Sequence, residues 1–150
     1  MMERVEEIAL ELVEEVCKVC KGSREGEDVL KAFRARARNM ATQLYFSGTA
    51  LVVSICAARS SVEAVEKGLK ARAISELAHI CNQRELTGEK AAYAIYGAAI
   101  LYALRALGTI SSQSFADAVR ELMDNRLADI VAWQFATWLK RFSEAYIHEG

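Results

Sequence analysis

The sequence contains no proline and only eight glycines among its 150 residues. Chains rich in β-sheet need these residues to form turns, so their scarcity favours helices. Apolar residues make up 53% of the chain and charged residues 26%, which is the balance of a globular protein rather than a disordered one. Because a chain of this length can bury a core of its own, we predict a single helical domain spanning residues 1–150.

The sequence also lacks the apolar stretches that direct a chain to a membrane. The longest apolar run covers residues 91–104 and is well short of the roughly 20 residues that span a bilayer. Glu3, Glu6 and Glu7 occupy positions where a secretory signal needs positive charge and then an apolar segment. We therefore expect a protein with no membrane partner, and a buried helix over residues 91–104.

Cysteine is scarce, and the four copies are too scattered to predict a secreted disulfide framework, which favours the reducing cytoplasm. The spacing Cys17-x-x-Cys20, combined with His79 and Cys81, would supply four ligands for tetrahedral zinc. The first pair lies on a predicted helix, however, and small buried thiols are the more ordinary interpretation. We predict no metal site from these residues or from Cys56.

Apolar residues recur at spacings of three and four along most of the chain, which is typical of amphipathic helices. Capping residues divide this pattern: Asp28, Ser60, Thr87 and one of the serines at 111–114 are expected to begin helices. Gly48 marks either close helix packing or a bend. We predict an all-α, compact bundle of five to six helices, covering about residues 3–21, 28–59, 60–84, 88–107, 111–126 and 127–147, with a loop at 22–27 and a possible interruption at 124–125.

The formal net charge of -1 predicts no partner, but one local cluster of charge does. At about 100° per residue, Lys31, Arg34 and Arg38 fall on one arc of a helix, which we call the basic ridge. Tyr45 follows on the same arc, whereas Arg36 lies off it, and no acidic residue occurs between positions 29 and 61. Guanidinium groups that lead to an aromatic ring can follow phosphates and stack a base. The alternative is an ordinary solvated helix face.

No arrangement of residues in the sequence predicts catalysis. Glu76-x-x-His79 has the spacing of a ligand pair in di-iron helical bundles, but it occurs once, and the only other histidine is His148. No nucleophile with a neighbouring base and no glycine-rich phosphate loop can be assembled. We expect a protein that is not an enzyme and needs no cofactor; a metal-dependent bundle enzyme is the weakest alternative.

The last predicted helix is rich in aromatic residues, with Lys140 and Arg141 among them. Such residues usually face the core, but they can also form an apolar patch that docks a partner, with the two cations on its rim. The aromatic residues are Trp133, Phe135, Trp138, Phe142 and Tyr146.

Two segments resemble a known family. Residues 31–59 (KAFRARARNMATQLYFSGTALVVSICAAR) are similar to the signature helix of the small subunit of the type III-B CRISPR effector, the Cmr complex. Residues 132–146 (AWQFATWLKRFSEAY) resemble the closing helix of that family, and residues 3–17 fit its first helix. The signature helix here lacks the proline of many members, and Thr49 follows Gly48 where they have leucine. The small subunit of the type III-A (Csm) complex, which is shorter, is therefore a second family to consider.

The resemblance implies a non-catalytic helical subunit of an antiviral, RNA-guided complex, stacked head to tail with copies of itself. Its partners would be the crRNA, the target RNA and the other subunits of the complex. By position, Lys31, Arg34, Arg36 and Arg38 match the basic part of the signature helix, and Lys140 and Arg141 match the closing motif. The alternative function is a stand-alone interaction module that docks a partner through its C-terminal aromatic helix.

Overall fold

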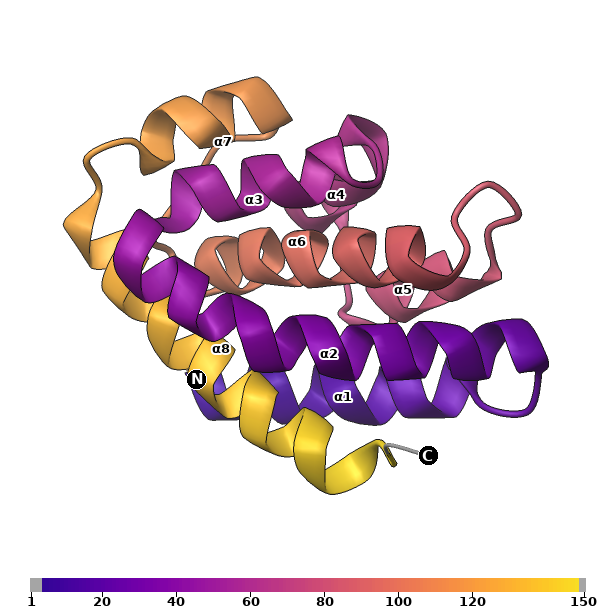
Figure 1. The fold of residues 1–150 in the computed structure, drawn as a ribbon. Helices are drawn as coiled ribbons and strands as arrows, with labels where there is room; N and C mark the ends of the chain where they lie inside the picture. Colours follow the sequence, from indigo (N-terminus) through magenta and orange to yellow (C-terminus); the bar gives the residue numbers. More distant parts are fainter. Residues whose placement is uncertain (1–3, 149–150) are drawn as a thin grey trace.

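The computed structural model describes residues 4–148, and this part of the chain folds into helices without a strand (Figure 1). The predicted all-α class is confirmed, but the expected five to six helices are too few, because residues 4–148 alone form eight α-helices and one 3-10 helix. They are α1 (Val5–Cys20), α2 (Arg24–Ser47), α3 (Thr49–Ala58), α4 (Val62–Lys70), α5 (Ser75–Ala78), η1 (His79–Asn82), α6 (Gly88–Ala106), α7 (Phe115–Leu122) and α8 (Arg126–Tyr146).

Helix α6 forms the centre of the bundle, and every residue from 91 to 104 is buried. It packs against α2 on one side and against α3 and α4 on the other, while α8 crosses α1 and α2 (Figure 1). The apolar run therefore forms a core helix, as predicted. In the described part of the chain, no helix is both long enough and apolar enough to cross a membrane.

Helix α2 begins earlier and ends sooner than the sequence predicts. The hydroxyl of Ser23 accepts a hydrogen bond from the amide of Gly26 at 3.0 Å, so Ser23, rather than Asp28, caps the helix and the predicted loop at 22–27 is largely helical. Gly48, with φ of 85°, ends α2. The prediction of one helix reaching residue 59 is wrong, and of the two alternatives for Gly48, close packing or a bend, the structure shows a bend.

The segment predicted as one helix over residues 60–84 divides into three pieces. Ser61, not Ser60, caps α4 by accepting a hydrogen bond from the amide of Ala64 at 3.1 Å. After α4 ends at Lys70, the Glu76 carboxylate accepts hydrogen bonds from the backbone amides of Arg72 and Ala73. These bonds hold the chain in a turn before α5, which a purely periodic pattern does not reveal.

Other boundaries agree with the sequence. Gly108 follows α6 with a positive φ of 76°, and the Ser114 hydroxyl caps α7. The interruption at 124–125 is present, with Asn125 capping α8. Thr87 occupies the N-cap position of α6 but its side chain makes no capping hydrogen bond.

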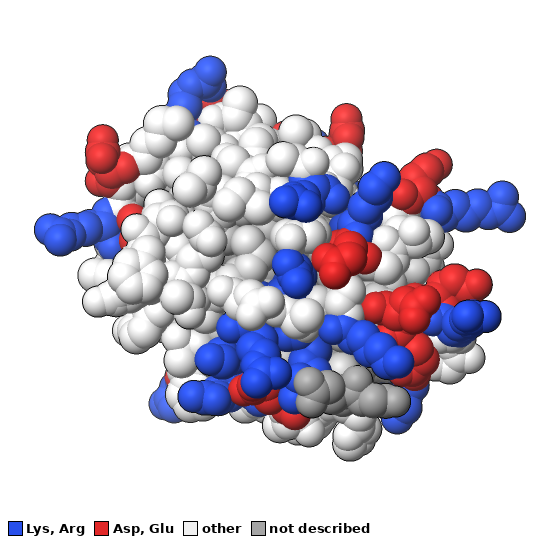
Figure 2. Space-filling model, viewed as in Figure 1, with Lys and Arg blue, Asp and Glu red and all other residues white. Residues whose placement is uncertain are grey.

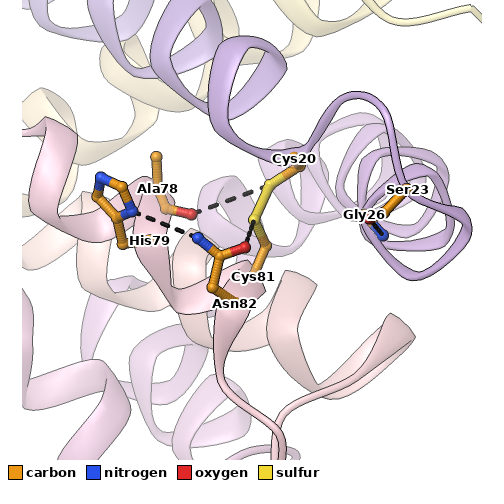
Figure 3. The surroundings of a disulfide bond; sticks show 7 residues. All are labelled: Cys20, Ser23, Gly26, Ala78, His79, Cys81 and Asn82. Atoms are coloured by element: carbon orange, nitrogen blue, oxygen red, sulfur yellow. Dashed lines mark hydrogen bonds between the residues drawn. A yellow bond between two sulfur atoms is a disulfide. The ribbon is translucent and has the colours of Figure 1, made fainter.

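One pair of cysteines corrects the sequence analysis. Cys20, at the end of α1, forms a disulfide with Cys81 of η1, and their Cα atoms are 6.1 Å apart (Figure 3). The cysteine spacing therefore does not argue for a reducing compartment. The four zinc ligands considered from the sequence cannot act together, because the thiols of Cys20 and Cys81 are bonded to each other. The Nδ1 atom of His79 lies 3.4 Å from the side-chain nitrogen of Asn82.

Candidate nucleic-acid interface

The basic ridge lies on the flank of α2 where Arg38 approaches Glu144 of α8. Lys31, Arg34 and Arg38 line a depression of about 290 Å³ together with Ala35 and Asn39. Lys31 and Arg38 are exposed, whereas Arg34 is half-buried. The Nε atom of Arg34 is buried, so this part of the ridge is not an ordinary solvated helix face.

The structure brings Tyr45 together with Lys140 and Arg141, which are distant in sequence. All three line a groove of about 370 Å³ between α2 and α8. Trp133 lies in the same groove, and its ring meets that of Tyr45 edge to face with centroids 5.8 Å apart. Because 63% of the Tyr45 side chain is exposed, its ring is available to a ligand in the groove.

A shared carboxylate connects the ridge to the groove. Oε1 of Glu144 lies 3.2 Å from a terminal nitrogen of Arg141, and Oε2 lies 3.8 Å from Nε of Arg38. Figure 2 shows Lys and Arg side chains gathered over α2 and the C-terminal half of α8. We call this combined area the α2–α8 surface; it consists of Lys31, Arg34, Arg38, Tyr45, Trp133, Lys140 and Arg141.

Arg36 does not belong to the α2–α8 surface. It lies on the other flank of α2, where its guanidinium donates a 2.7 Å hydrogen bond to the hydroxyl oxygen of Tyr93 on α6. The sequence places it off the arc, and the structure adds that it faces α6 and α3. Of the predicted RNA-binding residues, Arg36 is therefore the one that lies apart from the rest.

The aromatic residues of α8 divide between the core and the surface. Phe135 is fully buried, while Trp133 and Trp138 are each 42% exposed. The ring of Phe142 stacks on Trp138 with centroids 5.6 Å apart. The interpretation as a core-facing stripe at positions 138, 142 and 146 is therefore only partly correct: Phe142 packs against the core, whereas Trp138 and Tyr146 are exposed.

Phe46 is a further exposed aromatic residue, but it is not among the residues predicted from the sequence. Its side chain is 82% exposed, and its ring lies 5.1 Å from that of Tyr45. The sequence does indicate an uncharged surface in this region, because residues 39–58 contain no charged side chain. Figure 2 shows the result as a wide uncharged area over α3 and the end of α2.

The residues considered for a metal site serve other purposes. Hydrogen bonds from the amides of Ala73 and Arg72 lower the pKa of Glu76, so this carboxylate stabilises a turn. Among residues 4–148, no group of three or more His, Cys, Asp or Glu side chains could hold a metal ion. The Glu76-x-x-His79 spacing therefore has no further ligands around it in that part of the chain.

No protein-family model, no curated protein and no solved structure matches this chain.

Proposed function

We propose that this chain is the non-catalytic, RNA-binding small subunit of a type III-B CRISPR (Cmr) effector complex, with the type III-A (Csm) complex as the neighbouring possibility. The observation that carries the proposal is the α2–α8 surface. Its cations come from the two segments that resemble the family, residues 31–59 and 132–146, and these segments pack against each other as α2 and α8. Two motifs far apart in sequence thus contribute to one basic surface.

The chemistry of this surface suits RNA whose sequence is read elsewhere. In an RNA-guided complex, base pairing with the guide supplies sequence specificity, so a small subunit needs only contacts to phosphates and to neighbouring proteins. Guanidinium groups of Arg38 and Arg141 would bind phosphate oxygens. An unpaired base could stack on Tyr45 or Trp133, a contact worth about 1–3 kcal/mol. No cofactor is needed for this role.

The uncharged area over α3 offers a surface for neighbouring subunits or for copies of the same chain. Leu51 is exposed on α3, within the stretch of residues 39–58 that contains no charged side chain. Exposed apolar groups without nearby charge are typical of protein contacts. In this proposal, one part of the molecule binds RNA and another packs within the complex.

A second candidate function is supported by the aromatic cavity beside Gly48. Phe46, Ile130 and Trp133 are exposed around a cavity of about 550 Å³ between the end of α2 and the start of α8. A stand-alone interaction module could dock an apolar partner there without RNA. The two functions differ in their dependence on the basic ridge.

The proposal predicts that the variant K31Q/R34Q/R38Q binds single-stranded RNA more weakly than the natural protein. Each lost phosphate contact should cost roughly tenfold in affinity at 50 mM salt, and the slope of log affinity against log salt should become shallower by about 2 for three contacts. Filter retention of one RNA at several salt concentrations measures both. The loss should be similar for RNAs of different sequence.

The matched control is K18Q/K21Q/R84Q, which removes the same charge from exposed positions outside the α2–α8 surface. A second variant, Y45A/W133A, should weaken binding without changing the salt slope, because it removes rings and no charge. Thermal unfolding of each variant checks the fold. Equal RNA affinity of the ridge variant and the control would contradict the proposal and would favour the alternative function, a protein-interaction module.

A further inference from the structure

A second basic site lies on the flank of α2 that faces away from the α2–α8 surface. It is a cavity of about 690 Å³, which we call the Tyr93 cavity. Three helices meet there: α2, the C-terminal end of α3 and the first turns of α6. The lining residues are Arg36, Ala58, Arg59, Glu89, Lys90 and Tyr93.

Two arginines share one aromatic ring in this cavity. The guanidinium carbons of Arg36 and Arg59 lie 5.2 Å and 5.9 Å from the centroid of the Tyr93 ring. Both distances are within the range of about 6 Å over which a ring attracts a cation. The ring itself is buried, and its hydroxyl accepts the hydrogen bond from Arg36. The Arg36 guanidinium is therefore fixed before any ligand arrives.

The positive charge in the cavity exceeds the negative charge. Glu89 is the one carboxylate among the lining residues, and its Oε2 lies 3.8 Å from Nε of Arg36, beyond hydrogen-bond distance. Within residues 4–148, neither Arg59 nor Lys90 has a carboxylate partner. Like charges this close repel each other, and an anion between them would offset the repulsion.

A purely structural role accounts for only part of this arrangement. The guanidinium of Arg36 lies over the Tyr93 ring and contributes to its packing. Arg59 also lies over this ring, but both Arg59 and Lys90 are exposed, so their charged groups are accessible to a ligand. Because Arg36, Arg59 and Lys90 line one cavity, a bound anion would offset the repulsion between their charges.

We propose that the Tyr93 cavity binds a phosphate group, held by Arg59 and Lys90 beside the fixed Arg36. The planar fork of a guanidinium matches two phosphate oxygens, and the ammonium of Lys90 adds a mobile point charge. The phosphate belongs either to an RNA backbone or to a free nucleotide. The RNA source rests on the proposed function and would give α2 a phosphate contact on each flank; the nucleotide source does not depend on it.

The test uses the variant R59Q/K90Q, which leaves Arg36 and Tyr93 in place. The first probe is the single-stranded RNA of the preceding experiment, bound at several salt concentrations. The second is adenosine monophosphate, titrated in parallel with inorganic phosphate and followed by the NMR signals of the Tyr93 ring. We expect the RNA affinity to fall about tenfold per lost contact at 50 mM salt, with a slope shallower by about 1.4 for two contacts.

The control K18Q/R84Q removes the same net charge from two exposed positions outside the cavity, and thermal unfolding checks that each variant is folded. Weaker binding of RNA alone identifies a backbone phosphate, and weaker binding of adenosine monophosphate identifies a free nucleotide; both support the site. The site is wrong if R59Q/K90Q binds both probes as the control does. If K31Q/R34Q/R38Q still loses RNA in that case, the proposed function stands; if it does not, both fail.

Discussion

At the scale of single residues, the four cysteines occupy three environments that their spacing does not distinguish. Cys20 and Cys81 are 61 positions apart and form a disulfide between α1 and η1. Cys17, one turn before Cys20, is a half-buried free thiol whose pKa is raised by burial. Cys56 is fully buried, and burial raises the pKa of its thiol to about 12. Neither free thiol is therefore a ready nucleophile near neutral pH.

Removing the disulfide should destabilise the protein. Closing a loop of 61 residues lowers the entropy of the unfolded chain by an amount worth about 4 kcal/mol at 25 °C. Urea unfolding of C20S/C81S, or of the natural protein in reductant, should show a loss of that order. The control C17S should change stability far less.

Alkylation provides a direct check of the same bond. When the protein is unfolded without reductant, mass spectrometry should find two labelled cysteines, Cys17 and Cys56, and four after reduction. Four labelled cysteines without reductant would contradict the disulfide.

At the scale of elements, the break between α2 and α3 depends on a residue of α8. The carboxylate of Asp129 accepts hydrogen bonds from the amide and the hydroxyl of Thr49, at 2.8 Å and 2.7 Å. Thr49 opens α3 and is buried, so water does not satisfy these donors. Asp129 thus caps a helix that begins 80 positions earlier. Gly48 supplies the positive φ that turns the chain at this point.

The variant D129A should lose about 1–2 kcal/mol of unfolding free energy, the usual cost of removing a helix cap. D129N should lose less, because its amide oxygen still accepts a hydrogen bond. D117A is the matched control: Asp117 pairs with Arg120 on the surface of α7, and its loss should cost less than about 0.5 kcal/mol. Urea unfolding measures all three, and an unchanged midpoint for D129A would refute the capping role.

At the scale of the whole molecule, several carboxylates connect segments distant in sequence. Glu66 of α4 accepts a hydrogen bond from the amide of Phe115 at the start of α7, and this bond, followed by that from Lys70, lowers its pKa. Glu121 of α7 accepts hydrogen bonds from Ser112 and Ser111, which lower its pKa as well. These bonds attach α7 and the loop before it to the rest of the bundle.

The lowered pKa values predict how acid acts on the fold. Each carboxylate has a folded pKa below its ordinary value of 4.5, so its stabilisation is complete above that pH and is lost as pH falls through the folded value. The variant E66Q/E121Q should therefore melt below the natural protein at pH 7, and the difference should shrink below pH 4.5. The test is to measure the melting temperatures of both proteins from pH 7 to below pH 4.5. A difference in melting temperature that does not depend on pH would contradict a stabilising role of the two ionised carboxylates.

The sequence alone determined the features that depend on a few neighbouring residues. The helical class, the buried helix at residues 91–104, the ends at Gly108 and Asn125 and the arc of Lys31, Arg34 and Arg38 all follow from periodicity and caps. These signals act within one or two helical turns, where the spacing of two residues in the sequence determines whether they lie on the same face of the helix.

Only the tertiary structure decided the features that join distant residues. These include the extra helix at Gly48, capped by Asp129, the disulfide of Cys20 and the approach of Tyr45 to Arg141. They also include the position of Arg36 against Tyr93, 57 residues away. Their positions depend on how the helices pack around α6, and that packing depends on contacts across the whole core, which local pattern does not encode.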